Sequence, residues 1–392
     1  MFKQATVGQQ ASPPAPLDPA ELSRSLLPFG SSRMLPRGAY LDAEVLQWER
    51  RHIFSGWICV GRSTDVRAPR SMAAVSAGET GILLTRDPDG ELHAFENACR
   101  HRGHELLPCG GTATPRAIVC PYHSWTYNFD GTLRGAPGFR DADNFDKESL
   151  GLNPVPVREW HGWVFVDPSG ADGDFESRVG KLEDIVAPYD AASLQTAESH
   201  TYEVAANWKV VIENYQECYH CSMIHPELCR VSPPESGENL EPDGDWVGGW
   251  MELRSDADTM SLDGRSSGLA MARLDEQEAR TVMYVAVIPN LLISLHPDYI
   301  MSHVLMPLDA DHTRITCSWA FPPEAMAREG FDAKYAVDFW DLTNRQDWSA
   351  CESAQRGMHT PHFRPGPLAP AEDGVYQFVT YMARAYQGSP SE

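Results

Sequence analysis

The sequence is short of positive charge and of long apolar runs. Its 392 residues contain 32 Lys and Arg against 55 Asp and Glu, which gives a formal net charge of −23. Such an acidic chain repels phosphate backbones and anionic lipid heads, so we expect no nucleic-acid or membrane partner. The most apolar stretch, residues 282–297, is shorter than the ~20 residues that a bilayer requires, and it contains Pro289 and Asn290. It predicts two buried strands separated by a turn.

Signals for secretion and disulfide bonding are also missing. The first 19 residues contain one Lys and no apolar core, unlike a secretory signal. Nine cysteines, an odd number in a chain of this length, do not suggest a disulfide scaffold. In contrast, 42% hydrophobic and 10% aromatic residues are enough for a sizeable buried core. These features predict a globular, cytoplasmic protein of two or three domains with reduced cysteines.

The chain changes character near residue 168. Residues 1–39 are rich in Pro, Ala and Ser, which predicts an N-terminal arm with one short helix over 18–27. Residues 40–167 begin with a helix capped by Asp42 and continue as short strands bounded by Gly, Pro or Asp, the pattern of a small all-β domain. Residues 168–392 place consecutive strands between helical segments, the last over about 332–356. This order indicates an α+β domain with an antiparallel sheet, and we expect the arm to pack on it.

Two Cys–His pairs form the sharpest local motif. Cys99 and His101 make one pair, and Cys120 and His123 make a second after 18 intervening residues. Two thiolates and two imidazoles could hold a tetrahedral zinc ion or a Rieske [2Fe–2S] cluster, with the cysteines on one iron and the histidines on the other. Zinc sites usually pair ligands of one type, whereas each pair here mixes both types. A cluster needs that mixture if each loop serves both irons, so the spacing favours the cluster.

The residues around these pairs, CRHRGHELLPCGG and VCPYHSWTYNFDGTL, resemble the Rieske domain of Rieske non-haem iron ring-hydroxylating oxygenases, in their terminal oxygenase (α) subunits. Relatives often have Gly after the second His ligand, where this chain has Ser124. The resemblance covers about residues 40–386. It implies an all-β Rieske domain joined to a helix-grip catalytic domain that binds a mononuclear iron.

A second set of metal-binding side chains lies in NWKVVIENYQECYHCSMIHP. His220 and His225 are ~140° apart on an ideal helix, so a helix through them must bulge or end, and Pro226 fits an ending. Two imidazoles and a distant carboxylate would form a facial triad, which leaves open positions on Fe(II) for O2. A single Asp on a helix more often faces solvent, but the pattern D-x4-E-x2-Q-x-G that begins at Asp347 resembles the family at its third iron ligand.

The resemblance also implies roles for nearby residues. Glu217 would bridge to a cluster histidine of a neighbouring subunit and carry electrons between the two centres; the alternative is an ordinary helix-face Glu. Asn214 would lie near the iron without firmly binding it. Four residues fall in segments that line the substrate cavity of relatives, although residues of this kind are more often core than pocket: Trp246, Trp250, Leu292 and Leu295. Cys218 and Cys221 are expected to be free thiols and not ligands.

These assignments predict a terminal oxygenase. The family mechanism implies a separate NAD(P)H-dependent reductase or ferredoxin, electron transfer across a subunit boundary, and therefore a homotrimer. The N-terminal segment and Glu217 are most similar to glycine betaine, choline and stachydrine oxygenases, which favours monooxygenation or demethylation of a small or medium amine-like or natural-product substrate. Two alternatives stay open: an aromatic-ring mono- or dioxygenase, and a Rieske electron-transfer protein without oxygenase activity.

Overall fold

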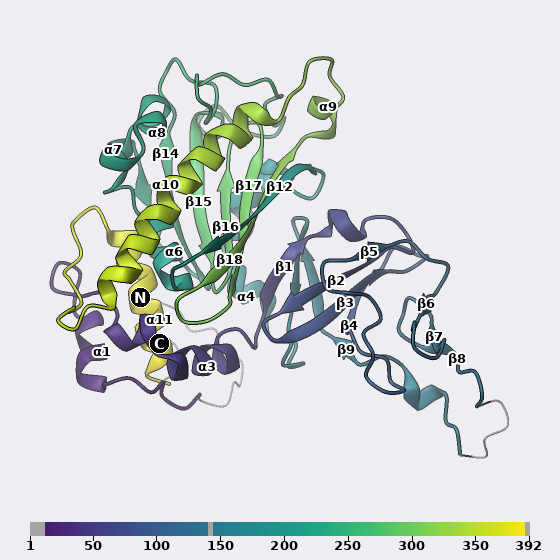
Figure 1. Ribbon diagram of the computed structural model, residues 1–392. Helices are drawn as coiled ribbons and strands as arrows, with labels where there is room; N and C mark the ends of the chain where they lie inside the picture. Colours follow the sequence, from purple (N-terminus) through teal and green to yellow (C-terminus); the bar gives the residue numbers. More distant parts are fainter. Residues whose placement is uncertain (1–11, 140–143, 389–392) are drawn as a thin grey trace. The chain divides into compact units, whose positions relative to one another are not determined.

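The computed structural model describes residues 12–139 and 144–388, and its contacts divide the chain into two units (Figure 1). The first unit combines the described residues up to 53 with those from 174 onward, and the second lies within residues 54–173. The boundaries expected from the sequence were 40 and 168. Residues 40–53 thus lie in the first unit, although the sequence assigned them to the second. Residues 1–11 of the predicted arm lie outside the described part of the chain.

The second unit consists of short antiparallel strands in three sheets. The largest follows the order β5 (Thr112–Ala113), β2 (Met72–Ala77), β3 (Thr80–Arg86), β4 (Leu92–Glu96) and β9 (Pro154–Val155). The other two are β1 (Ile58–Arg62), β11 (Trp163–Val166) and β10 (Val157–Trp160), and β6 (Ile118–Val119), β7 (Thr126–Tyr127) and β8 (Leu133–Gly135). This architecture confirms the predicted all-β domain.

The core of the second unit reaches the two Cys–His pairs. Aromatic and aliphatic side chains from β3, β4 and the β6–β8 sheet pack around Cys99 and Cys120, which are almost completely buried: Leu83, Phe95, Ile118, Trp125, Tyr127 and Leu133. Removing this apolar surface from water fixes the two loops that carry the pairs, one between β4 and β5 and one between β6 and β7.

The first unit contains one antiparallel sheet, in the order β12 (Gln195–Val204), β18 (Thr313–Phe321), β17 (Ile300–Pro307), β16 (Leu291–Leu295), β15 (Thr281–Val287), β14 (Trp246–Glu252) and β13 (Glu238–Asn239). Strands β15 and β16 are the two buried strands predicted within residues 282–297. They are apolar at almost every position because both of their faces are covered.

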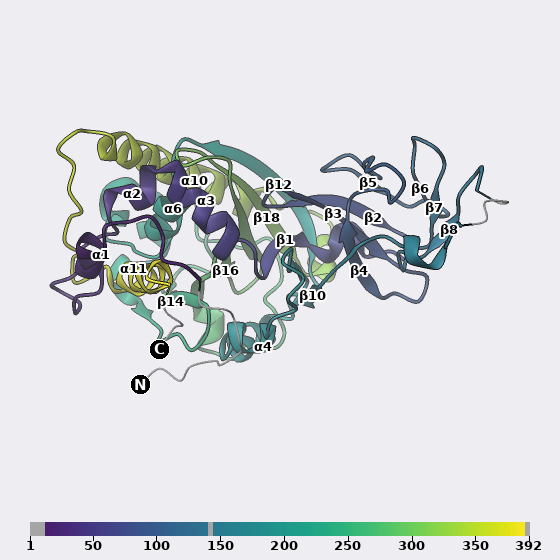
Figure 2. The same ribbon diagram turned by 90° about the horizontal axis from the view of Figure 1, so that it is seen from below.

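A long helix, α10 (Lys334–Met358), crosses one face of this sheet (Figure 1). Its buried residues recur at helical spacing, as expected for a helix that packs along one stripe: Val337, Trp340, Asn344, Trp348, Cys351, Gln355 and Met358. The segment before the histidines forms α6 (Trp208–Tyr215), which begins at Asn207, whose side chain accepts a hydrogen bond from the Lys209 backbone N–H. Helix α11 (Asp373–Tyr386) lies beside α6 and α1 (Pro19–Ser25) (Figure 2).

The remaining helices are short: α2 (Arg37–Leu41), α3 (Ala43–His52), α4 (Phe175–Val179), α5 (Leu182–Val186), α7 (Cys221–Ile224), α8 (Pro226–Val231) and α9 (Pro323–Met326). Within residues 12–139 and 144–388, no helix is both long and apolar enough to cross a membrane.

A buried ion pair explains why α3 belongs to the first unit. Glu49 of α3 accepts hydrogen bonds from Lys209 Nζ at 2.6 Å and Trp208 Nε1 at 2.8 Å, and also from the Tyr386 hydroxyl. The side chains of Glu49 and Lys209 are fully buried. A buried charge needs its partner, so this network fixes α3 to α6 and α11. The partner lies 160 residues away in the chain, which is why local sequence patterns placed α3 wrongly.

Candidate metal centres

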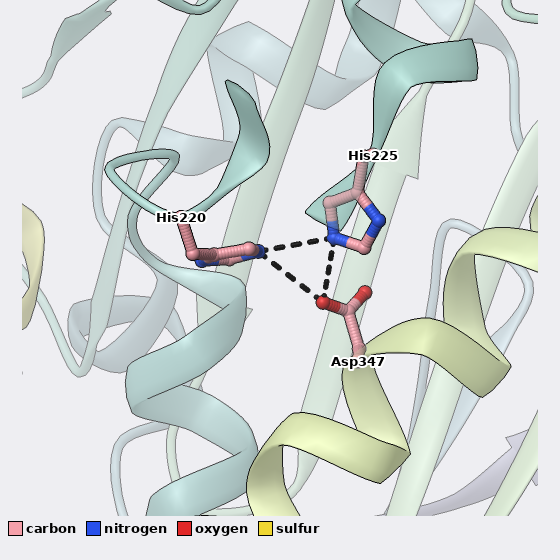
Figure 3. Close-up of side chains that lie close together, drawn as sticks. All are labelled: His220, His225 and Asp347. Carbon is pink, nitrogen blue, oxygen red and sulfur yellow. Dashed lines mark hydrogen bonds and ion pairs between the residues drawn. The ribbon is translucent and has the colours of Figure 1, made fainter. Parts of the chain in front are cut away.

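His220 and His225 lie on either side of the four-residue helix α7. Helix α6 ends at Tyr215, and α8 begins at Pro226, directly after His225. No single helix therefore carries both histidines, which confirms the prediction from their spacing. Asp347 extends from α10 toward the two imidazole rings (Figure 3).

The three side chains converge on one point. The Nε2 atoms of His220 and His225 are 3.1 Å apart, and Asp347 Oδ1 lies 2.8 Å from the second and 3.3 Å from the first. Imidazole and carboxylate ligands bind divalent first-row metals at about 2.0–2.2 Å. Two such ligands at right angles are about 3.0 Å apart, whereas tetrahedral ligands are about 3.4 Å apart. The triangle therefore fits one face of an octahedral metal site better than a tetrahedral one.

Oxygen atoms behind the rings fix the orientation of both histidines. His220 Nδ1 lies 2.5 Å from Glu217 Oε1, and His225 Nδ1 lies 2.7 Å from Gln346 Oε1. Each Nδ1–H donates to its oxygen, which leaves each Nε2 lone pair free to bind a metal. Glu217 also accepts the backbone N–H groups of Tyr219 and His220. Gln346 directly precedes Asp347 in the chain but was not predicted from the sequence.

The site attracts positive charge. Burial alone lowers the pKa of His220, but hydrogen bonds to Asp347 and Glu217 outweigh burial and raise it to about 10. Burial raises the pKa of the Asp347 carboxyl, but hydrogen bonds from His220 and His225 outweigh burial and lower it. A pocket that stabilises a proton on an imidazole in this way also stabilises a divalent cation. The donor set therefore fits a mononuclear iron.

A disulfide bridge encloses His220. The structure joins Cys218 and Cys221, whose Cα atoms are 4.9 Å apart, within the range that disulfide geometry allows. The prediction that both are free thiols was wrong, because the turn before α7 brings the two side chains together. The other seven cysteines are free: Cys59, Cys99, Cys109, Cys120, Cys229, Cys317 and Cys351.

In the second unit, the structure brings the two Cys–His pairs together. The rings of His101 and His123 are 4.6 Å apart, and His101 stacks on Trp125 at 5.0 Å. The Nδ1 atoms of both histidines are buried and have no hydrogen-bond partner. Two buried nitrogens without partners, beside two buried free thiols, are the atoms that a [2Fe–2S] cluster would bind. The residues therefore fit the cluster.

Tyr127 and Ser124 shape this centre. The Tyr127 hydroxyl accepts the Arg100 backbone N–H at 3.0 Å, so its own proton points to Cys99 Sγ at 3.2 Å. Such a bond to a cluster sulfur raises the reduction potential. Ser124 adopts a φ of 61°, in the left-handed region that Gly enters without cost. This conformation explains why relatives often have Gly there. Sequence reasoning missed Tyr127, because a tyrosine in a two-residue strand carries no local signal of its role.

The remaining predicted residues are placed as follows. Asn214 lies half-buried near the end of α6, six residues before His220. Directly paired strand residues share a face of the sheet, and successive residues alternate between the faces. Tyr215 bonds to Ser294, so Leu292, two residues away on β16, lies on the face toward α6. The pairing places the other three on the opposite face: Trp246, Trp250 and Leu295.

Comparisons with known proteins identify two domains in the chain. Residues 191–388 match the family described as "Ring hydroxylating alpha subunit (catalytic domain)", and residues 56–146 match the "Rieske [2Fe-2S] domain". The chain is 29% identical to the glycine betaine monooxygenase oxygenase subunit of Pseudomonas aeruginosa, over 94% of this chain and 93% of that protein. It is 30% identical to the corresponding subunit of Chromohalobacter salexigens, over 89% and 85%.

The fold also matches a solved structure. The quaternary ammonium Rieske monooxygenase CntA superposes with a TM-score of 0.80 at 24% identity, over 95% of this chain and 99% of that chain. This likeness confirms the two-domain architecture, with mixed helices and antiparallel sheets. The domain matches, the identity over nearly the whole chain and the common fold confirm the resemblance seen in the sequence. The chain belongs to the Rieske non-haem iron ring-hydroxylating oxygenases, as a terminal oxygenase α subunit.

Proposed function

We propose that His220, His225 and Asp347 bind the mononuclear iron of this oxygenase. The main support for this assignment is the triangle formed by their donor atoms, which are 2.8–3.3 Å apart. We further propose that Cys99, His101, Cys120 and His123 bind the [2Fe–2S] cluster, on the support of their buried, unpartnered nitrogens and free thiols. When bound, the iron supplies sites at which O2 is activated, and the cluster supplies electrons from a separate reductase or ferredoxin.

Within the chain, Glu217 orients His220 by accepting its Nδ1–H, and Gln346 does the same for His225. Glu217 lies just before Tyr219, whose side chain is 66% exposed, and near Met223, which is 85% exposed. Exposed apolar side chains also flank the cluster histidines, where Tyr122 is 50% exposed. Both surfaces suit contact with another chain. They support electron transfer between subunits through Glu217 in a homotrimer.

The substrate is proposed to be a small or medium amine-like compound, which the enzyme hydroxylates or demethylates. The support is the identity to relatives named for glycine betaine, together with aromatic rings near the triad, which attract ammonium groups. Aromatic hydroxylation is the alternative, because the same rings also stack on an aromatic substrate. An intact triad argues against a simple electron carrier, which needs no second iron. A cytoplasmic location is proposed on the composition alone.

A reductase-coupled screen with mass analysis of products tests this function. We expect O2-dependent gain of one oxygen, or loss of a methyl group, with an amine-like substrate. Asp347→Ala should abolish product while leaving the visible absorbance of the cluster unchanged. Asp338→Ala is the matched control, because Asp338 lies on the same helix in an exposed pair with Lys334. Full activity of Asp347→Ala would contradict the assignment.

A further inference from the structure

Five aromatic side chains form a continuous wall that starts at the proposed iron site. The wall comprises Trp348, His303, Tyr215, Tyr284 and Trp340, with successive ring centroids 6.0, 6.2, 6.0 and 6.3 Å apart. Trp348 directly follows Asp347 in the chain, and Tyr215 lies five residues before His220. Two members come from the sheet and three from α6 and α10. The wall therefore extends from the metal ligands across the helix-covered face of the sheet.

His303 presents a hydrogen-bond acceptor in this wall. Its Nε2 lies 3.2 Å from Asn344 Oδ1, while the Asn344 amide nitrogen donates to Cys317 Sγ. The amide orientation thus requires a proton on His303 Nε2, which leaves Nδ1 as a lone pair. That Nδ1 atom is buried and has no partner, in a residue that is 1% exposed. Burial lowers the pKa of His303 to about 4, so the ring is neutral at neutral pH.

Tyr284 presents the second unpartnered group. Its hydroxyl is buried without a hydrogen-bond partner, in contrast to the Tyr215 hydroxyl, which bonds to Ser294 at 2.8 Å. Burial raises the pKa of Tyr284, so the hydroxyl stays protonated and can donate. Unpartnered buried polar groups destabilise a fold. Trp348 Nε1 is a third buried group of this wall without a partner. Three such groups in one wall beside a metal site point to a ligand, and His303 and Tyr284 offer it one acceptor and one hydroxyl donor.

The charges around the wall restrict that ligand further. None of the five wall residues is cationic, and the neighbouring residues on the same sheet face are also neutral: Leu292, Ser294, Met301 and Cys317. Asp347 acts electrostatically on His303, and Arg345, which lies over the Tyr202 ring beside Trp348, is already paired with Asp341. A carboxylate on the substrate would find no cationic side chain in this wall, whereas an ammonium group would lie against aromatic rings.

We propose that His303 and Tyr284 determine substrate specificity, and that the substrate is a small amine or quaternary ammonium compound with a hydroxyl group and without a carboxylate. The hydroxyl donates to His303 Nδ1, and a substrate oxygen accepts from the Tyr284 hydroxyl. The inference rests on the proposed oxygenase function and narrows its substrate class.

The test measures binding of three probes to the iron-loaded protein under argon, by calorimetry. Choline has a quaternary ammonium and a hydroxyl, its O-methyl ether lacks the hydroxyl proton, and glycine betaine has a carboxylate in place of the hydroxyl. We expect choline to bind roughly tenfold or more tightly than either of the others, because each leaves His303 Nδ1 without a donor. Equal or tighter binding of the ether or of glycine betaine would overturn the proposal.

Substitutions locate the effect. His303→Leu should remove the difference between choline and its ether, whereas His303→Asn, which keeps an acceptor close to the Nδ1 position, should retain part of it. Tyr284→Phe should weaken choline binding by a similar factor of about ten. Thr380→Val is the control, because Thr380 also carries a buried hydroxyl without a partner but lies on α11. A choline–ether difference that survives in His303→Leu would contradict the role of His303.

Failure of this inference is distinguishable from failure of the proposed function. Coupled turnover of a carboxylate-bearing amine at least as efficient as that of choline would overturn the specificity proposal and leave the oxygenase function standing. If His303→Leu does not retain the cluster absorbance, His303→Asn and Tyr284→Phe decide the test. Because binding is measured without O2, the probes test the wall even if the enzyme oxidises none of them. Absence of oxidation would count against the proposed function but not against the specificity proposal.

Discussion

Glu49→Gln should destabilise the catalytic unit while leaving the Rieske unit unchanged. Glu49 is the only negatively charged group within hydrogen-bond distance of Lys209 among the described residues, and both side chains are fully buried. The substitution keeps the shape of Glu49 but removes its charge. Lys209 then loses its hydrogen-bonded counter-ion, and Glu213, which does not bond to it, is the carboxyl that still acts on it.

The expected loss can be worked from the contact. At 2.6 Å and an effective dielectric constant of about 20, the attraction is about 6 kcal/mol. In the folded variant, Lys209 can avoid part of this loss by releasing its proton. At pH 7 this deprotonation costs about 4.6 kcal/mol, calculated from an unfolded-state lysine pKa near 10.4. The free energy of unfolding should therefore fall by about 3–5 kcal/mol at pH 7. The loss should shrink by about 1.4 kcal/mol for each unit of pH above 7.

Urea unfolding of the complete protein measures this effect with two signals. Seven of the eleven tryptophans lie in the first unit and four in the second. The visible absorbance of the cluster follows the second unit alone, so a fluorescence change without a matching absorbance change reports the first unit. Glu44→Gln, an exposed position on the same helix, should change stability by less than about 0.5 kcal/mol. Adding Lys209→Met to Glu49→Gln should restore part of the loss. A loss below about 1 kcal/mol, or one that does not vary with pH, would refute the reasoning.

Three further predictions concern the two centres and the sheet. Gln346→Leu removes the acceptor of His225 Nδ1–H and should weaken iron binding about 10–100-fold, measured by iron retention against a chelator; unchanged retention would contradict the orienting role. Tyr127→Phe should lower the midpoint potential of the cluster by about 60 mV, the equivalent of a hydrogen bond of about 1.4 kcal/mol, and an unchanged redox titration would exclude that bond as a determinant. Burial lowers the pKa of His296 to about 3 and that of His303 to about 4. Between about pH 6.5 and 4, the unfolded chain therefore binds up to two more protons than the folded chain. The contribution of these histidines to the free energy of unfolding is fully present above pH 6.5 and should fall by up to about 2.7 kcal/mol for each unit by which the pH decreases. His296→Phe should remove about half of that slope in urea titrations at pH 7, 6 and 5, and an undiminished slope would show that other groups cause it.

Most of the proposed metal ligands could be predicted from the sequence because they lie in short motifs, whereas Asp347, 122 residues after His225, was predicted only through the resemblance to the family. Cys99 and His101 share one loop, and His220 and His225 are separated by only four residues. Turn geometry over such distances is local, so spacing alone limits what the side chains can bind. The same holds for strands β15 and β16, whose apolar runs are long enough to indicate burial.

The substrate wall was not accessible in this way, because strand register decides which side chains face the iron. Leu292 and Leu295 are both fully buried on β16. They lie on opposite faces of the sheet, because successive side chains alternate between the faces and these two residues are three positions apart. The same rule separates Trp246 and Trp250 from Tyr284. His303 carried no metal-ligand spacing, and its role emerges only from Asn344, which lies 41 residues away.

The most direct test of the account is a count of iron and acid-labile sulfide in the wild-type protein and in Asp347→Ala. We expect about three irons and two sulfides per wild-type chain. We expect about two irons and two sulfides in the variant, since the cluster in the other unit remains. An Asp347→Ala chain that retains the third iron, or a wild-type chain with zinc and no sulfide, would contradict the account.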